Sequence, residues 1–178
     1  MTRAALALIL LIVASACLAE EDLSQYRVPS GFLPVVGEPL SPFELEQLDR
    51  GPASLGSFAG RPLVVTFFFS DCAPCVRDVG ALNTFSRSNP AIGVVAITFD
   101  TADRASRFVL EYGLEWPVLV DAQSYFDQIG VLAFPSFALV DERGVLLGAT
   151  YGNRLGGEDG TVTAEGLDRW VKSLVPEV

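Results

Sequence analysis

Apolar runs and amphipathic stretches alternate along this chain. Residues 62–69 (PLVVTFFF) and 91–99 (AIGVVAITF) are continuous apolar runs rich in β-branched and aromatic side chains, which is typical of strands buried on both faces. Between them, residues 73–88 carry apolar side chains at a helical spacing. These side chains are Val76, Val79, Leu82 and Phe85. The pattern predicts a strand, a helix and a second strand parallel to the first.

The alternation continues in the second half of the chain. Residues 100–113 begin with an N-cap-like Asp100 or Thr101 and end at Gly113, so they predict a helix. The other expected elements are strands at 43–48 and 116–121, a helix at 122–131, two strands joined at 142–144 within 136–152, and a helix at 163–175 capped by Thr163. Alternating units favour a parallel central sheet, to which the hairpin adds antiparallel strands at one side. The predicted fold class is therefore α/β with a mixed sheet.

The first residues have the pattern of a secretory signal. Arg3 precedes an apolar run at 4–13, which is short for a membrane span and suits a signal sequence. Small residues at 14–16 then form a candidate cleavage site. We predict a signal peptide at 1–16, with an uncleaved N-terminal anchor as the alternative. A secretory signal implies a compartment that permits disulfides, so we expect an extracytoplasmic protein.

Cys17 follows the small-residue run directly. VASAC (13–17) resembles the bacterial lipobox, in which the cysteine becomes the lipidated N-terminus of the mature protein, although Ala14 stands where Leu is usual. A lipidated Cys17 would tether the protein to a membrane. In the alternative, Cys17 leaves with the signal peptide, for instance after cleavage behind Ala19. We assign residues 17–35 to a tether and residues 36–178 to one folded domain.

The amino-acid composition excludes several kinds of catalytic and metal-binding site. The 178 residues include no histidine, so Ser-His and Cys-His catalytic pairs and His-ligated haem or zinc are excluded. Three cysteines alone cannot complete a four-ligand zinc site, and we expect no metal. The net charge of -10 argues against nucleic acid or an anionic membrane surface as the main partner.

The stretch FFFSDCAPC places Cys72 and Cys75 where the first buried strand gives way to a helix. Free N–H groups and the dipole at a helix N-terminus stabilise a thiolate. Cys75, one turn further on, lies within reach of the Cys72 sulfur. We expect an exposed attacking thiol at Cys72, a partly buried resolving thiol at Cys75, and a redox-active disulfide between them as the only redox group. Pro74 falls in the first turn, where its missing N–H costs nothing.

Two other interpretations of this cysteine pair stay open. Two soft thiolates can bind Cu(I), which would make the chain a copper-binding or interaction module without redox turnover. The pair can also form a purely structural disulfide, although closing so short a loop contributes little entropy.

Asp71 is the unusual residue of the motif. A carboxylate beside Cys72 opposes formation of the thiolate, because like charges disfavour each other's ionisation. The thiolate belongs to the reduced form, so we predict that Asp71 keeps the dithiol reducing. The alternative is that Asp71 points into solvent and has little effect, as exposed charges usually do.

Three segments together resemble the thioredoxin fold, and most of all the extracytoplasmic thiol–disulfide oxidoreductases of the TlpA/ResA type. They are GRPLVVTFFFSDCAPC (60–75), WPVLVD (116–121) and GVLAFPSFALVDERGVLLGATYG (130–152). The resemblance covers about residues 36–175. It implies a thioredoxin-like three-layer α/β/α fold with an extra strand and helix between the CxxC helix and the strand that follows the proline. It also implies a periplasmic or cell-surface dithiol that reduces protein disulfides, often in apocytochrome c or copper-site assembly, and an upstream membrane or periplasmic electron donor.

The same resemblance implies roles for further residues. Pro135 would be a cis-proline facing the CxxC motif, and Phe134 would line the substrate groove beside it. Thioredoxins carry a buried acid where this chain has Thr66. Asp100 can replace that acid, although we favour an N-cap role for it. A peroxiredoxin would need Thr in place of Phe69, and a Sco-type copper protein would need CxxxC and a histidine.

Overall fold

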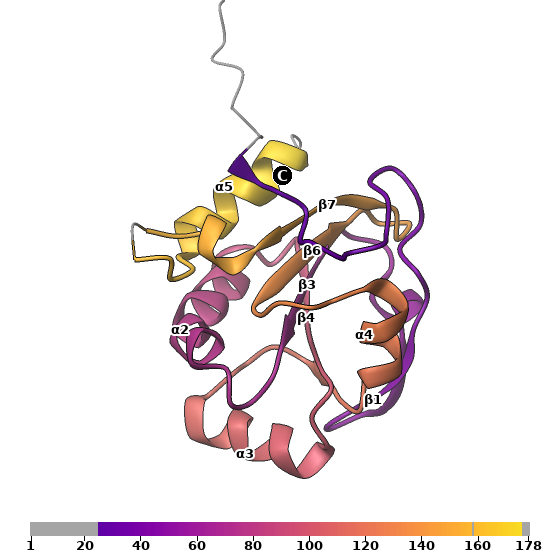
Figure 1. Cartoon of the computed structure of the whole chain (residues 1–178), viewed down its shortest axis with the longest axis vertical. Coiled ribbons are helices and arrows are strands. Elements are labelled where there is room, and N and C mark those ends of the chain that lie inside the picture. Colours follow the sequence, from indigo (N-terminus) through magenta and orange to yellow (C-terminus); the bar gives the residue numbers. More distant parts are fainter. Residues whose placement is uncertain (1–24, 158, 176–178) are drawn as a thin grey trace, which may run out of the picture.

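The computed structural model describes residues 25–157 and 159–175, so the predicted signal peptide and Cys17 lie outside the described residues. The described chain forms a seven-stranded sheet with helices on both faces (Figure 1). Its strands are β1 (Glu44–Gln47), β2 (Gly51–Ser54), β3 (Leu63–Phe68), β4 (Gly93–Thr98), β5 (Val118–Leu119), β6 (Ser136–Val140) and β7 (Leu146–Tyr151). Its helices are α2 (Ala73–Ser88), α3 (Ala102–Tyr112), α4 (Gln123–Ile129) and α5 (Ala164–Leu174), with short 3-10 turns η2 (Leu55–Phe58) and η3 (Gly152–Arg154).

The sheet is mixed, as the alternation of elements predicted. Its strand order is β2-β1-β5-β4-β3-β6-β7. Strands β3, β4 and β5 are parallel, and the β6–β7 hairpin adds antiparallel strands beside β3. A second hairpin, β1–β2, extends the other edge through an antiparallel contact with β5. The elements α3 and β5 supply the extra helix and strand that the resemblance implied.

The two faces of the sheet bury different cores because side chains alternate along β3. All residues of β3 are buried. Val64 belongs to the core under α2, α3 and α5, and Val65 to the core under α4. Figure 1 shows α2 and α4 on opposite sides of the sheet, which gives three layers.

The strand register determines where the site lies. Phe68 at the end of β3 is aligned with Thr98 at the end of the neighbouring parallel strand β4. The loops that follow these two strands therefore leave the sheet side by side. The first loop leads to Cys72 and α2, and the second leads to Asp100 and α3.

Strand β5 is clearly shorter than the sequence predicted. Strand β5 covers only Val118–Leu119, since Pro117 has no N–H to donate and Asp121 adopts a positive φ of 55°. Helix α3 begins at Ala102 with Thr101, one of the two expected residues, as its N-cap, and it ends at the C-cap residue Gly113 as predicted. The favoured N-cap role of Asp100 was therefore wrong, and its carboxylate has other partners that are described below.

The described part of the predicted tether contacts the domain. The Ser30 N–H donates to the Tyr151 hydroxyl (2.5 Å), and the Leu33 N–H donates to the Ile129 carbonyl (2.9 Å). Gly130, with a φ of 70°, lies so close to the backbone of Gly31 that a Cβ there would stand 1.8 Å from its carbonyl oxygen. The domain boundaries stay a prediction, and the segment before residue 36 is held on the domain by backbone contacts.

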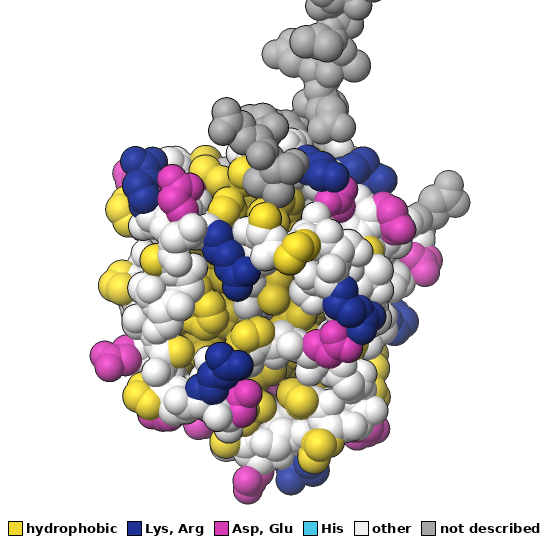
Figure 2. Space-filling model, turned by 180° about the vertical axis from the view of Figure 1, so that it is seen from behind, with side chains coloured by type: hydrophobic (Ala, Val, Ile, Leu, Met, Phe, Trp, Pro, Cys, Tyr) yellow, Lys and Arg dark blue, Asp and Glu magenta, His cyan; other side chains and the backbone are white. Residues whose placement is uncertain are grey.

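On the face shown in Figure 2, Lys and Arg side chains are scattered, several of them beside an acidic side chain, with apolar side chains between many of them. Within the described ranges, no helix is both long enough and apolar enough to cross a membrane.

Candidate active site

Cys72 and Cys75 form a disulfide at the N-terminus of α2. Cys72 is the N-cap residue, and its sulfur accepts a hydrogen bond from the Cys75 N–H (3.2 Å). Their Cα atoms are 5.2 Å apart, and Pro74 lies in the first turn of the helix as predicted. The two sulfurs therefore lie at the positive end of the α2 dipole, where a thiolate is stabilised.

The predicted difference in exposure between Cys72 and Cys75 is not observed in the disulfide-bonded form. Each is only 4% exposed. In the disulfide, the Cys72 sulfur is bonded to Cys75 and accepts the amide of that residue, so it lies over the helix end rather than in solvent. The expected exposed thiol at Cys72 is thus not a property of the oxidised form.

The Phe134–Pro135 peptide bond is cis, as the resemblance implied. Pro135 precedes β6, and its carbonyl accepts the Gly152 N–H (2.8 Å) at the start of η3. Its ring lines the same small cavity as Cys75. The structure thus brings the two halves of the predicted site together from segments that are far apart in the sequence.

Phe134 is part of an aromatic cluster. Its ring centroid lies 5.2 Å from that of Phe69, 5.8 Å from that of Phe99 and 5.7 Å from that of Phe126. The ring is therefore half-buried, and its packing against these three rings holds the Phe134–Pro135 segment against the domain. A role of Phe134 in a substrate groove stays a proposal.

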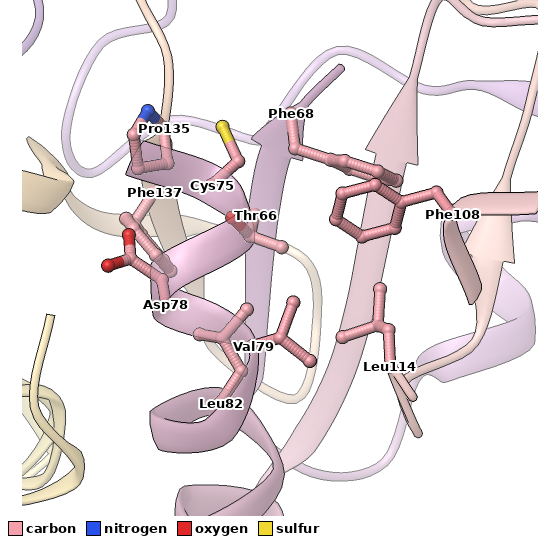
Figure 3. A pocket seen from close by; sticks show the side chains of 10 residues that line it. All are labelled: Thr66, Phe68, Cys75, Asp78, Val79, Leu82, Phe108, Leu114, Pro135 and Phe137. Atoms are coloured by element: carbon pink, nitrogen blue, oxygen red, sulfur yellow. The ribbon is translucent and has the colours of Figure 1, made fainter. Parts of the chain in front are cut away.

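A cavity of about 10 Å³ lies under the disulfide, close to the space that one water molecule needs. It is mainly apolar, and its lining residues are Thr66, Phe68, Cys75, Asp78, Val79, Leu82, Phe108, Leu114, Pro135 and Phe137. Figure 3 shows Cys75 and Asp78 on α2, with Pro135 and Phe137 on one side and Phe68 and Phe108 on the other. Asp78, an ionisable residue, thus lines the same mainly apolar cavity as Cys75.

Asp78 is the site residue that the sequence analysis missed. It is 2% exposed, and burial raises its pKa to about 6, against the opposing effects of the Val162 N–H (3.0 Å) and the charge of Arg77. A carboxyl group with this pKa exchanges protons near neutral pH. The signal was its position: three residues after Cys75 and four before Leu82, it falls on the buried stripe of the helix.

The buried acid of this site therefore comes from the helix and not from the strand. Thr66 occupies the strand position where thioredoxins carry an acid, and it lines the same cavity as Asp78. Asp100, which we considered as a replacement, is buried, but it is not among the cavity-lining residues.

Asp71 and Asp100 both form an ion pair with Arg104 of helix α3. Asp71 has a 76% exposed side chain that pairs with Arg104 of α3 (Oδ2 to Nη2, 2.7 Å). Asp100 accepts hydrogen bonds from the Ser70 N–H (2.6 Å) and hydroxyl (2.8 Å). Asp71 is thus exposed, as one of the two alternatives expected, and it is paired with Arg104; its effect on Cys72 stays a prediction.

A family model described as Redoxin matches residues 35–164. The chain belongs to the Redoxin family. Among similar curated proteins, the thioredoxin-like protein YneN of Bacillus subtilis is 25% identical over 115 residues, covering 62% of this chain and 68% of that protein. The thiol-disulfide oxidoreductase ResA of Bacillus anthracis is 24% identical over 145 residues, covering 79% of each chain. The expected resemblance to this type of protein is confirmed.

Solved structures show the same fold. A putative thiol:disulfide interchange protein DsbE from Chlorobium tepidum superposes with a TM-score of 0.68 at 22% identity, over 79% of this chain and 99% of that one. StoA from Bacillus subtilis gives a TM-score of 0.60 at 18% identity, over 76% and 98%. The predicted thioredoxin-like fold is confirmed by these likenesses. Across residues 25–157 and 159–175, no group of three or more potential metal ligands of the His, Cys, Asp and Glu types is found.

Proposed function

We propose that this chain is an extracytoplasmic thiol–disulfide oxidoreductase that reduces disulfides in protein substrates. The observation that carries the proposal is the Cys72–Cys75 disulfide at a helix N-terminus, in contact with a cavity shared by Pro135 and a buried carboxylate. The Redoxin family match and the relatives named thiol-disulfide oxidoreductases support the same class of reaction.

The reaction proceeds in two exchange steps. In the reduced protein, the Cys72 thiolate attacks one sulfur of a substrate disulfide, forming a mixed disulfide and expelling the other substrate sulfur as a thiolate. The Cys75 thiolate then attacks the Cys72 sulfur, which releases the second substrate thiolate and forms the Cys72–Cys75 disulfide. Two electrons pass from the protein to the substrate, and a membrane or periplasmic dithiol donor restores the reduced protein.

Asp78 is the proton acceptor for the second step. Cys75 is buried, and burial in apolar surroundings disfavours its thiolate. Above pH 6 the Asp78 carboxyl group is mostly ionised and able to take the proton of the Cys75 thiol within the shared cavity. Asp78 thereby takes the proton-accepting role of the acid that thioredoxins carry at the position of Thr66.

The remaining site residues frame the sulfurs. Pro74 shapes the first turn of α2, and Phe134 and Pro135 form the wall of the groove in which a substrate polypeptide lies. Asp71 tunes the ionisation of Cys72. Relatives named thiol-disulfide oxidoreductases support protein substrates, and the family resemblance extends the proposal to apocytochrome c or copper-site assembly.

The location follows from the N-terminal sequence. We propose that residues 1–16 are removed as a signal peptide and that a lipidated Cys17 anchors the domain. Mass spectrometry of protein extracted from membranes tests this step. A mature N-terminus at Cys17 with acyl chains supports it, whereas an unlipidated N-terminus beyond Cys17 refutes the anchor and leaves the redox proposal intact.

Turnover of a protein disulfide tests the proposed function itself. The protein reduced with dithiothreitol should reduce the interchain disulfides of insulin catalytically, and Cys72→Ala should abolish this. Metal content and Cu(I) titration are measured on the same preparation. A protein that binds one Cu(I) per Cys pair and turns over no disulfide would instead be a copper-binding module.

A further inference from the structure

Arg104 joins two acidic residues that lie on either side of the catalytic turn. From α3, its Nη2 atom contacts Asp71 Oδ2 (2.7 Å), and its Nε atom contacts Asp100 Oδ1 (3.0 Å). Asp71 directly precedes Cys72, and Asp100 follows β4. One guanidinium group therefore binds both loops that leave the sheet at this edge.

Asp100 extends this connection to the backbone before the cysteines. Its Oδ2 atom accepts the Ser70 N–H (2.6 Å), the Ser70 hydroxyl (2.8 Å) and the Thr98 hydroxyl (3.1 Å). The Asp100 side chain is buried, so its charge is compensated by Arg104 and these donors. Residues 70 and 71 are thus both fixed to the α3 side of the molecule, Ser70 through Asp100 and Asp71 through Arg104.

We propose that Arg104 is a positioning residue of the redox site, which anchors the turn before Cys72 and offsets the charge of Asp71 beside the Cys72 thiolate. It acts through Asp71 and Asp100 and touches no reacting atom. The inference rests on the redox role of Cys72 in the proposed function, but not on the direction of electron flow or on the identity of the substrate.

The sign of the electrostatic effect follows from the charges. A carboxylate next to Cys72 disfavours the thiolate, and the paired guanidinium weakens that effect. Without Arg104, Asp71 acts on Cys72 uncompensated, so the thiol pKa of Cys72 rises and the reduced form loses stability. The protein then becomes more reducing. Removing Asp71 instead has the opposite sign.

The same helix offers a matched control. Arg107 also lies on α3, and it lines the same open hollow of about 300 Å³ as Asp71 and Arg104. It is exposed, and among the described residues it forms no ion pair. Arg107→Gln therefore removes one positive charge from the same surface without breaking the Asp71–Arg104–Asp100 connection.

The first test compares Arg104→Gln, Arg107→Gln, Asp71→Asn and the double variant Arg104→Gln/Asp71→Asn. The pKa of Cys72 is measured by thiolate absorbance in the reduced proteins, and the redox equilibrium is measured against glutathione. Arg104→Gln should raise the pKa and lower the equilibrium constant for reduction of the protein about two- to fivefold, which corresponds to about 10 to 20 mV. Asp71→Asn should shift both in the opposite sense, Arg107→Gln should shift neither, and the double variant should lie between the two single variants because Asp100 also loses its cation.

The second test separates anchoring from charge. In the double variant neither Asp71 nor Arg104 carries a charge beside Cys72, and the link from α3 to the turn is lost. The rate at which the fully ionised thiolate attacks a small disulfide should therefore stay at least twofold below that of the unchanged protein. A full recovery of this rate would refute the anchoring role.

Equal shifts in Arg104→Gln and Arg107→Gln, or shifts of the same sign in Arg104→Gln and Asp71→Asn, would overturn the electrostatic role. The glutathione equilibrium requires only the Cys72–Cys75 pair. It therefore reports on Arg104 even if insulin is not reduced, so the failure of this inference and the failure of the proposed function are distinguishable.

Discussion

The carboxyl group of Asp78 lies one helical turn after Cys75, and both side chains line one small cavity beneath the disulfide. The cavity is otherwise mainly apolar, which explains why burial dominates the ionisation of Asp78. Helix α2 buries one face against the core, and Asp78 lies on that buried face. Such a placement is unfavourable for folding and useful for proton transfer, and both consequences can be measured.

The buried acid makes stability depend on pH. Folding raises the pKa of Asp78 from 3.8 to about 6, so the folded state binds this proton more tightly than the unfolded state does. The free energy of unfolding should therefore fall as pH rises from about 4 to 6. Asp78→Asn removes this penalty and retains an acceptor for Val162, so it should stabilise the oxidised protein at pH 7.5 by about 2 to 3 kcal/mol.

Urea unfolding of the oxidised proteins at several pH values measures this difference. The gain from Asp78→Asn should shrink as the pH falls below 6 and be smallest near pH 4. Asp127→Asn, on the exposed face of α4, serves as a surface control and should change stability by less than about 0.5 kcal/mol. A gain that is the same at pH 4 and pH 7.5 would show that Asp78 does not titrate in this range.

The same substitution should slow the resolving step. If Asp78 accepts the proton of Cys75, the rate at which a mixed disulfide on Cys72 is released should rise through pH 6 and then level off. Asp78→Asn should lose this rise and release the substrate at least about tenfold more slowly, since positioned general bases contribute that much or more. Rapid-mixing kinetics with a preformed mixed disulfide measures the step. An unchanged rate and pH profile would mean that another group takes the proton.

The cysteines should differ when each is removed alone. Cys75→Ala leaves Cys72 at the helix N-terminus, where its thiolate attacks a substrate, but removes the thiol that resolves the mixed disulfide. Covalent complexes should therefore accumulate in cells and disappear on reduction. Cys72→Ala should trap far fewer. Non-reducing electrophoresis of the two variants compares them directly, and the reverse pattern would exchange the two roles.

Much of the fold was predictable because local patterns agree with the final packing. The buried strand β3, the limits of α2 and the Thr163 cap of α5 follow from apolar runs, helical spacing and capping residues. Strand β5 was predicted too long because its ends depend on Pro117 and on the positive φ of Asp121. The apolar pattern reports burial, but it does not show where pairing stops.

The candidate site was predictable where one short segment contains it. Cys72 and Cys75 are three residues apart, and their chemistry follows from that spacing. The contacts of Asp71 and Asp100 join segments about 30 residues apart, and only the register of β3 with β4 brings these together. Asp78 was missed because an acid within a helix is normally assigned to the solvent face.

Two glycines in helices should respond to substitution in opposite ways. In α5, a Cβ at Gly166 would stand 2.0 Å from the Leu155 carbonyl oxygen, so Gly166→Ala must push the helix away from that backbone. It should destabilise the protein by roughly 1 to 3 kcal/mol, as overpacking does. Gly80 is exposed in α2 with open space around its Cα, so Gly80→Ala should stabilise by about 0.5 to 1 kcal/mol through helix propensity alone. Denaturant unfolding of the two oxidised variants measures both values. Equal effects of one sign would show that α5 does not pack against Leu155 as closely as described.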